Sequence, residues 1–223
     1  MISIQDLRYR LLAIDSLTIG RGITAIIGAN GSGKTSLLKL CAGITLPEAG
    51  TVLIEEKEPR STEIGWVNEF PDRNFLFVRA GDEIASPLRF QHAAPGEICR
   101  RTEEIWKKTG ISGPPDRPVR ELSGGEKVLV ALAAAVITRP RVLILDECDS
   151  HLDARTHSNV DRMLRDANIP FILKSTQDME NAARCDDVIV LENGRVADCG
   201  KPELVFERLK NTPLYPLSWR FLA

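Results

Sequence analysis

One short stretch of this sequence, GANGSGKT at residues 28–35, restricts the possible folds more than any other feature. It fits the pattern GxxxxGK[ST], it follows the β-branched run Ile23–Ile27, and it precedes the helix-like stretch Thr35–Cys41. This order of strand, glycine-rich loop and helix is the context in which the pattern forms a phosphate-binding P-loop. Glycine lets the backbone turn so tightly that successive N–H groups face one anion at the positive end of the helix. The sequence therefore predicts a site for nucleotide phosphates.

The P-loop also suggests roles for single residues. The ammonium of Lys34 can reach the β- and γ-phosphates of a nucleoside triphosphate, and the hydroxyl of Thr35 can bind Mg²⁺. The residues that we expect around the phosphates are Gly28, Ala29, Asn30, Gly31, Ser32, Gly33, Lys34, Thr35 and Ser36.

A second motif consists of the apolar run Val142–Leu145 followed by two acids, Asp146 and Glu147. In an open α/β sheet, ligands bind beyond the carboxyl ends of the strands. Asp146 is then placed to bind Mg²⁺, and Glu147 to orient or deprotonate an attacking water. Such a run is weakly informative alone, but with a P-loop upstream it indicates a nucleoside triphosphatase.

The rest of the pattern predicts an α/β protein. Short β-branched runs, typical of buried parallel strands, alternate with helical stretches. The expected strands are Ile23–Ile27, Thr51–Ile54, Val142–Leu145 and Phe171–Leu173, and the expected helices are Thr35–Cys41, Glu97–Lys108 and Glu126–Thr138. Asn193-Gly194, between two apolar runs, predicts a hairpin with a type I′ turn. Residues 71–121 are predicted to be a mostly helical insertion with one amphipathic helix near 97–108.

Composition excludes several classes of protein. With 29 Lys and Arg against 31 Asp and Glu, the net charge is -2, so no nucleic-acid partner is expected. The longest apolar run, Val128–Ile137, has ten residues where a bilayer needs about 20, and the first residues are too polar for a signal peptide. Five scattered cysteines are typical of reduced thiols in the cytoplasm. We therefore expect neither an integral membrane protein nor a secreted one.

The segment Leu122-Ser-Gly-Gly-Glu126 narrows the family. Ser123 and Glu126 have the spacing of a capping box that opens a helix, and the two glycines leave its first turn bare for a phosphate. In the order P-loop, LSGGE, Asp146-Glu147 and Ser150–Asp153, the sequence resembles the ATP-binding cassette (ABC) superfamily over almost its whole length.

That resemblance implies one ABC ATPase domain over residues 1–223. Its RecA-like P-loop core spans about 1–70 and 122–223 with an N-terminal antiparallel β subdomain, and its inserted α-helical subdomain spans about 71–121. It also implies ATP and Mg²⁺ as cofactors. The signature residues Ser123, Gly124, Gly125 and Glu126 then contact the ATP on a partner's P-loop, in a head-to-tail dimer with a second copy or a sister ATPase.

Within the superfamily, the sequence is most similar to transporter ATPases of the energy-coupling-factor or cobalt type. The similarity lies in Ile64–Phe77 and in the ending Gly200–Phe206. It implies the ATP-hydrolysing subunit of a metal-ion or vitamin transporter, which couples closure of its dimer to a transmembrane partner. Such a subunit is cytoplasmic and lies at the inner face of the cell membrane through that partner.

Two positions depart from the family pattern. Glu69 stands where the family has a glutamine near Mg²⁺, so we expect it either to bind Mg²⁺ or to be a solvated loop acid. Gln177 stands where the family has a histidine. An amide donates a neutral hydrogen bond to the γ-phosphate, but unlike histidine it cannot take up a proton or a positive charge, so slow ATP turnover is expected.

Several alternatives remain open at this point. The chain could be a soluble ABC ATPase that acts on nucleic acid or a macromolecular assembly, although only about 90 residues separate Lys34 from Ser123 and they contain no coiled-coil repeat. It could also be a nucleotide-binding regulator with almost no turnover. Tyr9 either stacks on adenine or packs in a strand. Trp219 and Phe221 pack on the body of the protein or form a subunit contact.

Overall fold

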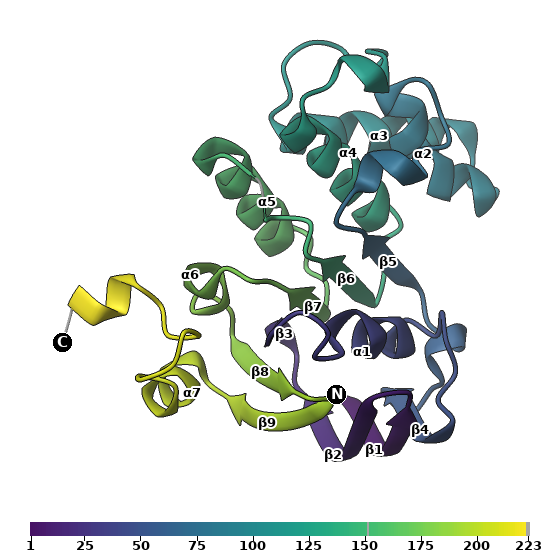
Figure 1. Cartoon of the computed structure of the whole chain (residues 1–223). Helices are drawn as coiled ribbons and strands as arrows, with labels where there is room; N and C mark the ends of the chain where they lie inside the picture. Colours follow the sequence, from purple (N-terminus) through teal and green to yellow (C-terminus); the bar gives the residue numbers. More distant parts are fainter. Residues whose placement is uncertain (151, 222–223) are drawn as a thin grey trace. The chain divides into compact units, whose positions relative to one another are not determined.

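The computed structural model describes residues 1–150 and 152–221 (Figure 1). Contacts within the chain divide it into two compact units. The first unit comprises Met1–Ile64, Ile144–Glu147 and Pro170–Ala223, and the second comprises Gly65–Leu143 and Cys148–Ile169. The helical insertion predicted over 71–121 lies wholly in the second unit.

An antiparallel sheet of three strands occupies the beginning of the first unit. Strand β1 (Ile2–Tyr9) lies between β2 (Leu12–Ile19) and β4 (Ala49–Ile54). Ile2 pairs with Ile19 on one side and with Ile54 on the other, and all three side chains are buried. Alternation of apolar and polar residues therefore turns one face of this sheet inward.

The larger sheet of the first unit is mainly parallel and positions the P-loop. Its central strand β3 (Gly22–Ile27) pairs in parallel with β7 (Phe171–Ser175) and with β8 (Asp187–Glu192). Helix α1 (Lys34–Cys41) follows β3 directly after the loop. Strand β6 (Val142–Asp146) ends at Asp146, which accepts a hydrogen bond from the hydroxyl of Ser175 in β7.

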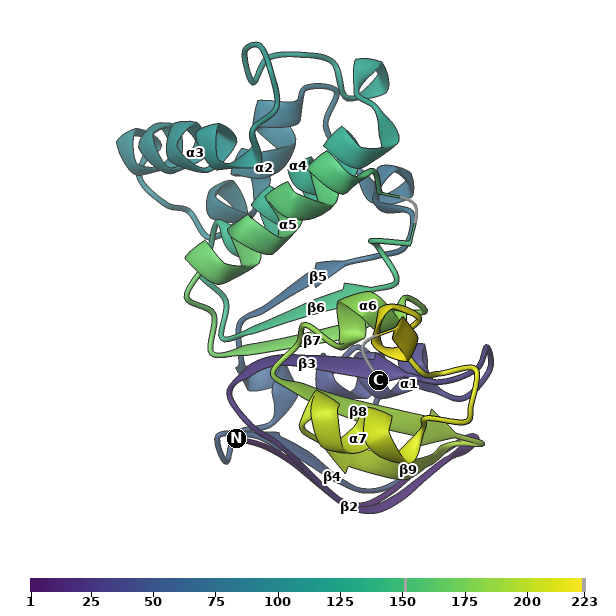
Figure 2. The same ribbon diagram turned by 90° about the vertical axis from the view of Figure 1, so that its left-hand side faces the viewer.

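The predicted hairpin at Asn193-Gly194 is confirmed. Strand β9 (Arg195–Gly200) returns antiparallel to β8, and Asn193 and Gly194 have φ angles of 48° and 78°, as a type I′ turn requires. Helices α6 (Met179–Ala182) and α7 (Pro202–Arg208) follow β7 and β9 (Figure 2). They enclose a core made of Ala25, Ile27, Ala182, Val188, Val190, Val205, Phe206 and Tyr215.

The second unit is mainly helical. After β5 (Ile64–Val67) it contains α2 (Ala80–Phe90), α3 (Pro95–Thr109), α4 (Gly124–Val136) and α5 (Ala154–Asp166). Short 3-10 turns in the chain are Pro59–Ser61, Pro71–Asn74, Val119–Glu121 and Ser218–Phe221. No helix in the described part of the chain is long and apolar enough to cross a bilayer.

The amphipathic helix predicted near 97–108 is confirmed as α3, but a second helix of the insertion, α2, precedes it and was not predicted. Helix α2 contains Pro87, which cannot donate a hydrogen bond to the carbonyl of Glu83 and normally argues against a helix. The hydroxyl of Ser86 donates to that carbonyl instead, at 2.8 Å. A side chain thus satisfies the acceptor that the proline leaves.

The carboxyl-terminal segment packs on the first unit through Trp219. The ring of Trp219 meets Phe206 and Tyr215 edge-on, with centroids 5.6 and 6.2 Å away. Both the backbone N–H and the hydroxyl of Ser218 donate to the carboxylate of Glu180 in α6. The prediction that Trp219 packs on the body of the protein is confirmed, whereas the side chain of Phe221 lies outside the described part.

We expect Trp219→Ala to lower the free energy of unfolding by about 1–2 kcal/mol, because a half-buried ring loses its apolar area and two edge-on aromatic contacts. Trp219→Phe is the matched control, since it keeps an aromatic ring and should lose less than half as much. Urea unfolding followed by circular dichroism measures both. An alanine variant as stable as the wild type would contradict the packing role.

Candidate functional site

The P-loop has the backbone that a phosphate site needs. Gly28 has a φ of 148°, and a Cβ there would lie 2.2 Å from the carbonyl oxygen of Leu191, so no other residue fits. Gly33, with a φ of 107°, precedes the first residue of α1, which is Lys34. The first N–H groups of a helix have no acceptor within it, and they carry its positive dipole end. This helix start suits an anion, and the binding of phosphates by the residues of the loop stays a prediction.

The hairpin turn after β8 supports the P-loop from one side. Gly194 donates its N–H to the carbonyl of Ser32 at 3.1 Å and accepts from the N–H of Ala13 at 2.9 Å. A Cβ on Gly194 would lie 2.0 Å from the carbonyl oxygen of Leu11. The sequence predicted this turn but not its contact with the loop. The hydroxyl of Ser32 is buried without a hydrogen-bond partner among the described residues, so an unsatisfied polar atom lies within the loop.

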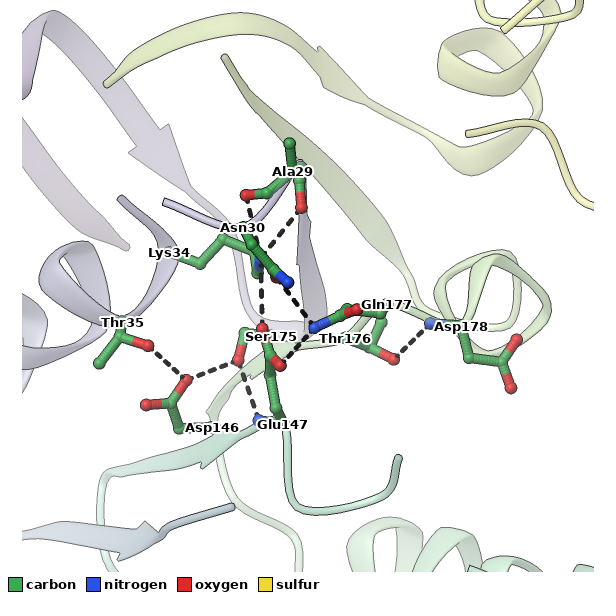
Figure 3. A network of polar contacts seen from close by, with 11 residues as sticks. Ala29, Asn30, Lys34, Thr35, Asp146, Glu147, Ser175, Thr176, Gln177 and Asp178 are labelled. Atoms are coloured by element: carbon green, nitrogen blue, oxygen red, sulfur yellow. Dashed lines mark hydrogen bonds and ion pairs between the residues drawn. The ribbon is translucent and has the colours of Figure 1, made fainter. Parts of the chain in front are cut away.

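Asp146 and Thr35 meet at the carboxyl edge of the parallel sheet, as the two motifs predicted. The Thr35 hydroxyl donates to Asp146 Oδ1 at 3.1 Å, and the Ser175 hydroxyl donates to the same oxygen at 2.7 Å (Figure 3). Oxygen atoms of hydroxyl and carboxylate groups are ligands that Mg²⁺ prefers. Ser175, a fully buried residue at the end of β7, was not among the predicted site residues. The sequence signal that could have identified Ser175 is its position at the carboxyl end of a predicted apolar strand, where ligands of such sheets bind.

A connected group of three side chains follows from the same loop and strand ends that hold Thr35 and Asp146. It consists of Glu147, Gln177 and Lys34. Lys34 Nζ lies 3.2 Å from Glu147 Oε1, and Gln177 Nε2 donates to Glu147 Oε2 at 2.7 Å. Gln177 Nε2 also donates to Asn30 Oδ1 at 3.1 Å. The three predicted catalytic residues thus lie together, with a P-loop residue attached to them (Figure 3).

The signature segment lies in the second unit and has the predicted capping box. Ser123 Oγ accepts from the N–H of Glu126 at 3.2 Å, and Glu126 Oε2 accepts from the N–H of Ser123 at 2.8 Å. Arg117 pairs with Glu126 at 3.2 Å. A Cβ on Gly124 would meet no atom within 4 Å, so this end of α4 is bare there. A Cβ on Gly125 would lie 2.8 Å from Thr156 Oγ1 of α5.

Other predicted residues belong to other elements. Glu69 is exposed just after β5 in the second unit, and its proposed Mg²⁺ role stays a prediction. Tyr9 ends β1, with the guanidinium of Arg10 lying 5.2 Å above its ring, and its contact with adenine also stays a prediction. Asp153 caps α5 by accepting from the N–H of Thr156 at 2.7 Å.

Comparison with known proteins gives one consistent family. Residues 13–150 match the ABC transporter family. The chain is 33% identical over 221 residues to the energy-coupling factor transporter ATP-binding protein EcfA1 of Lactiplantibacillus plantarum, covering 91% of this chain and 78% of the relative. EcfA1 of Clostridioides difficile is 33% identical over 216 residues, covering 90% of this chain and 78% of that one.

Solved structures agree with this family. The structure of cbiO1 from Clostridium perfringens, part of the ABC transporter complex cbiONQ, aligns with a TM-score of 0.83 and 30% identity over 92% of this chain and 90% of its own. An ATP binding subunit of an ABC transporter aligns with a TM-score of 0.79 over 99% of this chain and 98% of its own, at 22% identity. The predicted α/β fold of an ABC ATPase is confirmed.

The capping box predicts how stability changes with pH. Burial opposes the ionisation of Glu126, but hydrogen bonds from the Ser123 backbone and from Arg117 outweigh it and hold the pKa of Glu126 below its ordinary value. A carboxyl group with a lowered folded pKa stabilises the fold above its unfolded pKa, and this stabilisation is lost as the pH falls through the folded pKa. Glu126→Gln should therefore cost more stability at about pH 7 than at about pH 3.

Urea unfolding at the two pH values measures this difference. The matched control is Glu104→Gln, because Glu104 is an exposed carboxylate of α3 that pairs with Arg100 one turn away. Its effect should be small at both pH values. An equal loss of stability for Glu126→Gln at both pH values would contradict the capping box as the cause.

Proposed function

The chain belongs to the ABC transporter family, and on this premise we propose that it is the ATP-binding and ATP-hydrolysing subunit of an energy-coupling-factor type transporter. The observation that carries the ATPase activity is that both acids contact the P-loop: Glu147 pairs with Lys34 at 3.2 Å, and Asp146 accepts from the hydroxyl of Thr35 at 3.1 Å. The transport task that we propose is the uptake of a metal ion or a vitamin. The solute itself is selected by other subunits in this family.

ATP and Mg²⁺ fit the residues of the first unit. The N–H groups of the loop and the ammonium of Lys34 bind the phosphates, with Gly28, Ala29, Asn30, Gly31, Ser32, Gly33, Thr35 and Ser36 around them. Thr35 and Asp146 supply oxygen ligands for the metal, and Glu69 is a further candidate ligand. Mg²⁺ supplies charge neutralisation for the phosphates when it is bound. A cradle of backbone donors and a hydroxyl–carboxylate pair at 3.1 Å support this assignment.

We assign the water-activating role to Glu147. Its carboxylate can orient the attacking water and accept its proton, which is general base catalysis. Gln177 takes the place of a histidine and supplies one neutral donor instead of a group that can be charged. Weak intrinsic turnover follows, because a preorganised donor stabilises the transition state most when it carries charge.

The subunit acts as a dimer beneath a membrane partner. We propose that the dimer is head-to-tail, so that Ser123, Gly124, Gly125 and Glu126 of one subunit reach the ATP bound by the other. The bare helix start at Gly124 supports this, since it leaves backbone donors open to a phosphate. The partner ATPase is a second copy or a sister subunit. Attachment to the membrane partner places the chain at the cytoplasmic face of the cell membrane.

Gln177→His tests the proposed cause of slow turnover. We expect the rate at saturating ATP to rise roughly tenfold, a part of the 10²–10³ that one preorganised donor can supply. Phosphate release from the purified protein measures the rate, and Lys34→Ala serves as the blank for contaminating activity. An unchanged or lower rate in the histidine variant would show that the amide does not limit turnover.

Affinity purification tests the transporter assignment. The tagged protein, recovered from gently solubilised native membranes, should bring with it an integral membrane subunit, with or without a second ABC ATPase. The untagged chain is the matched control. Recovery only from the soluble fraction, together with nucleic acid or soluble partners, would favour the alternative of a soluble ABC ATPase that acts on a macromolecular assembly.

A further inference from the structure

The ammonium of Lys34 is fully used by the protein itself. It donates to the carbonyl oxygens of Gly28 and Ala29 at 2.9 and 3.4 Å, and it lies 3.2 Å from Glu147 Oε1. An ammonium has three donor hydrogens, and the Lys34 side chain is only 5% exposed. A nucleotide phosphate can therefore reach this ammonium only in place of a partner that it already has. The only anionic partner among these three is the carboxylate of Glu147.

Gln177 holds the other oxygen of that carboxylate. Its amide nitrogen donates to Glu147 Oε2 at 2.7 Å and to Asn30 Oδ1 at 3.1 Å. A primary amide has two donor hydrogens, so both are used. Gln177 thus links the carboxylate of Glu147 to Asn30 of the P-loop through hydrogen bonds. We call this set of contacts, among Lys34, Glu147, Gln177 and Asn30, the paired arrangement (Figure 3).

The backbone fixes Glu147 in this place. Its φ is 51°, a left-handed conformation that costs a residue other than glycine free energy and that persists only where surrounding contacts hold it. The N–H of Glu147 donates to Ser175 Oγ at 3.0 Å, which provides such a contact. The carboxylate is 17% exposed, so it interacts with Lys34 under weaker screening than a surface pair would.

We propose that Gln177 is a positioning residue that keeps the carboxylate of Glu147 on Lys34, so that the phosphates of a nucleotide must displace the carboxylate in order to bind. This inference rests on the proposed function, because it takes Lys34 as the phosphate ligand and Glu147 as the group that activates water. Displacement couples two events. The carboxylate becomes available to a water only when a phosphate has taken its place on the ammonium.

ADP binding without Mg²⁺ isolates this role. ADP places a β-phosphate on Lys34 but has no γ-phosphate, so a hydrogen bond from Gln177 to the γ-phosphate has no influence. Gln177→Ala should tighten ADP binding about 3–10-fold, the effect of one hydrogen bond that no longer favours the paired arrangement. The same variant should lower kcat for ATP, because the γ-phosphate loses the neutral donor that Gln177 supplies. A merely structural defect would weaken binding and kcat together.

A double-mutant cycle shows whether Gln177 acts through Glu147. In a Glu147→Ala background, the further change Gln177→Ala should leave ADP affinity unchanged, since the carboxylate that it holds is gone. Isothermal titration calorimetry in the presence of EDTA measures all four proteins. Gln5→Ala, which removes an exposed glutamine of β1, is the matched control and should bind like the wild type.

The outcomes separate this proposal from the proposed function. A wild-type chain that binds neither ADP nor ATP would overturn the nucleotide site itself. A wild type that binds both, with Gln177→Ala binding ADP equally well or more weakly, would overturn the positioning role alone. Equal tightening by Gln177→Ala in both backgrounds would show that Gln177 acts on ADP without Glu147, and would also overturn it.

Discussion

The parallel pairing of β3 with β7 determines where the chemistry of this protein can occur. Gly22 pairs with Phe171 and Ile26 with Ser175, so the two strands end at the same edge of the sheet. The P-loop leaves this edge after β3, and Gln177 follows β7 two residues beyond Ser175. The end of β6 is joined to them through the hydrogen bond between Ser175 and Asp146. Groups far apart in the sequence therefore share one edge.

The buried ammonium of Lys34 requires a neighbouring anion, and this requirement governs which groups can lie at this edge of the sheet. Lys34 is withdrawn from water, and an unpaired buried charge is costly, so an anion beside it is always favoured. The carboxylate of Glu147 and the phosphate of a nucleotide both meet that need. The neutral amide of Gln177 adds hydrogen bonds without altering the sum of charges. Exchange of one anion for another then leaves the ammonium compensated throughout.

The features predicted from the sequence are those whose geometry and chemistry are both determined by residues close together in the chain. The P-loop, the capping box of Ser123 and Glu126, and the Asn193-Gly194 turn are of this kind. Helix α2 was missed because Pro87 opposes a helix locally and the compensating hydroxyl of Ser86 is visible only in the structure. The links from Gln177 to Glu147 and Asn30 join residues 30 and 147 positions apart, and no local pattern encodes them.

Trp219 provides the first unit with an intrinsic fluorescence probe. Of the three tryptophans, Trp66 and Trp106 belong to the second unit, and only Trp219 lies in the first. Its indole touches Phe206 and Tyr215, and its neighbour Ser218 is bonded to Glu180 in the helix that begins directly after Gln177 and Asp178. The emission of this indole therefore senses the surroundings of the segment that follows Gln177, without any attached dye.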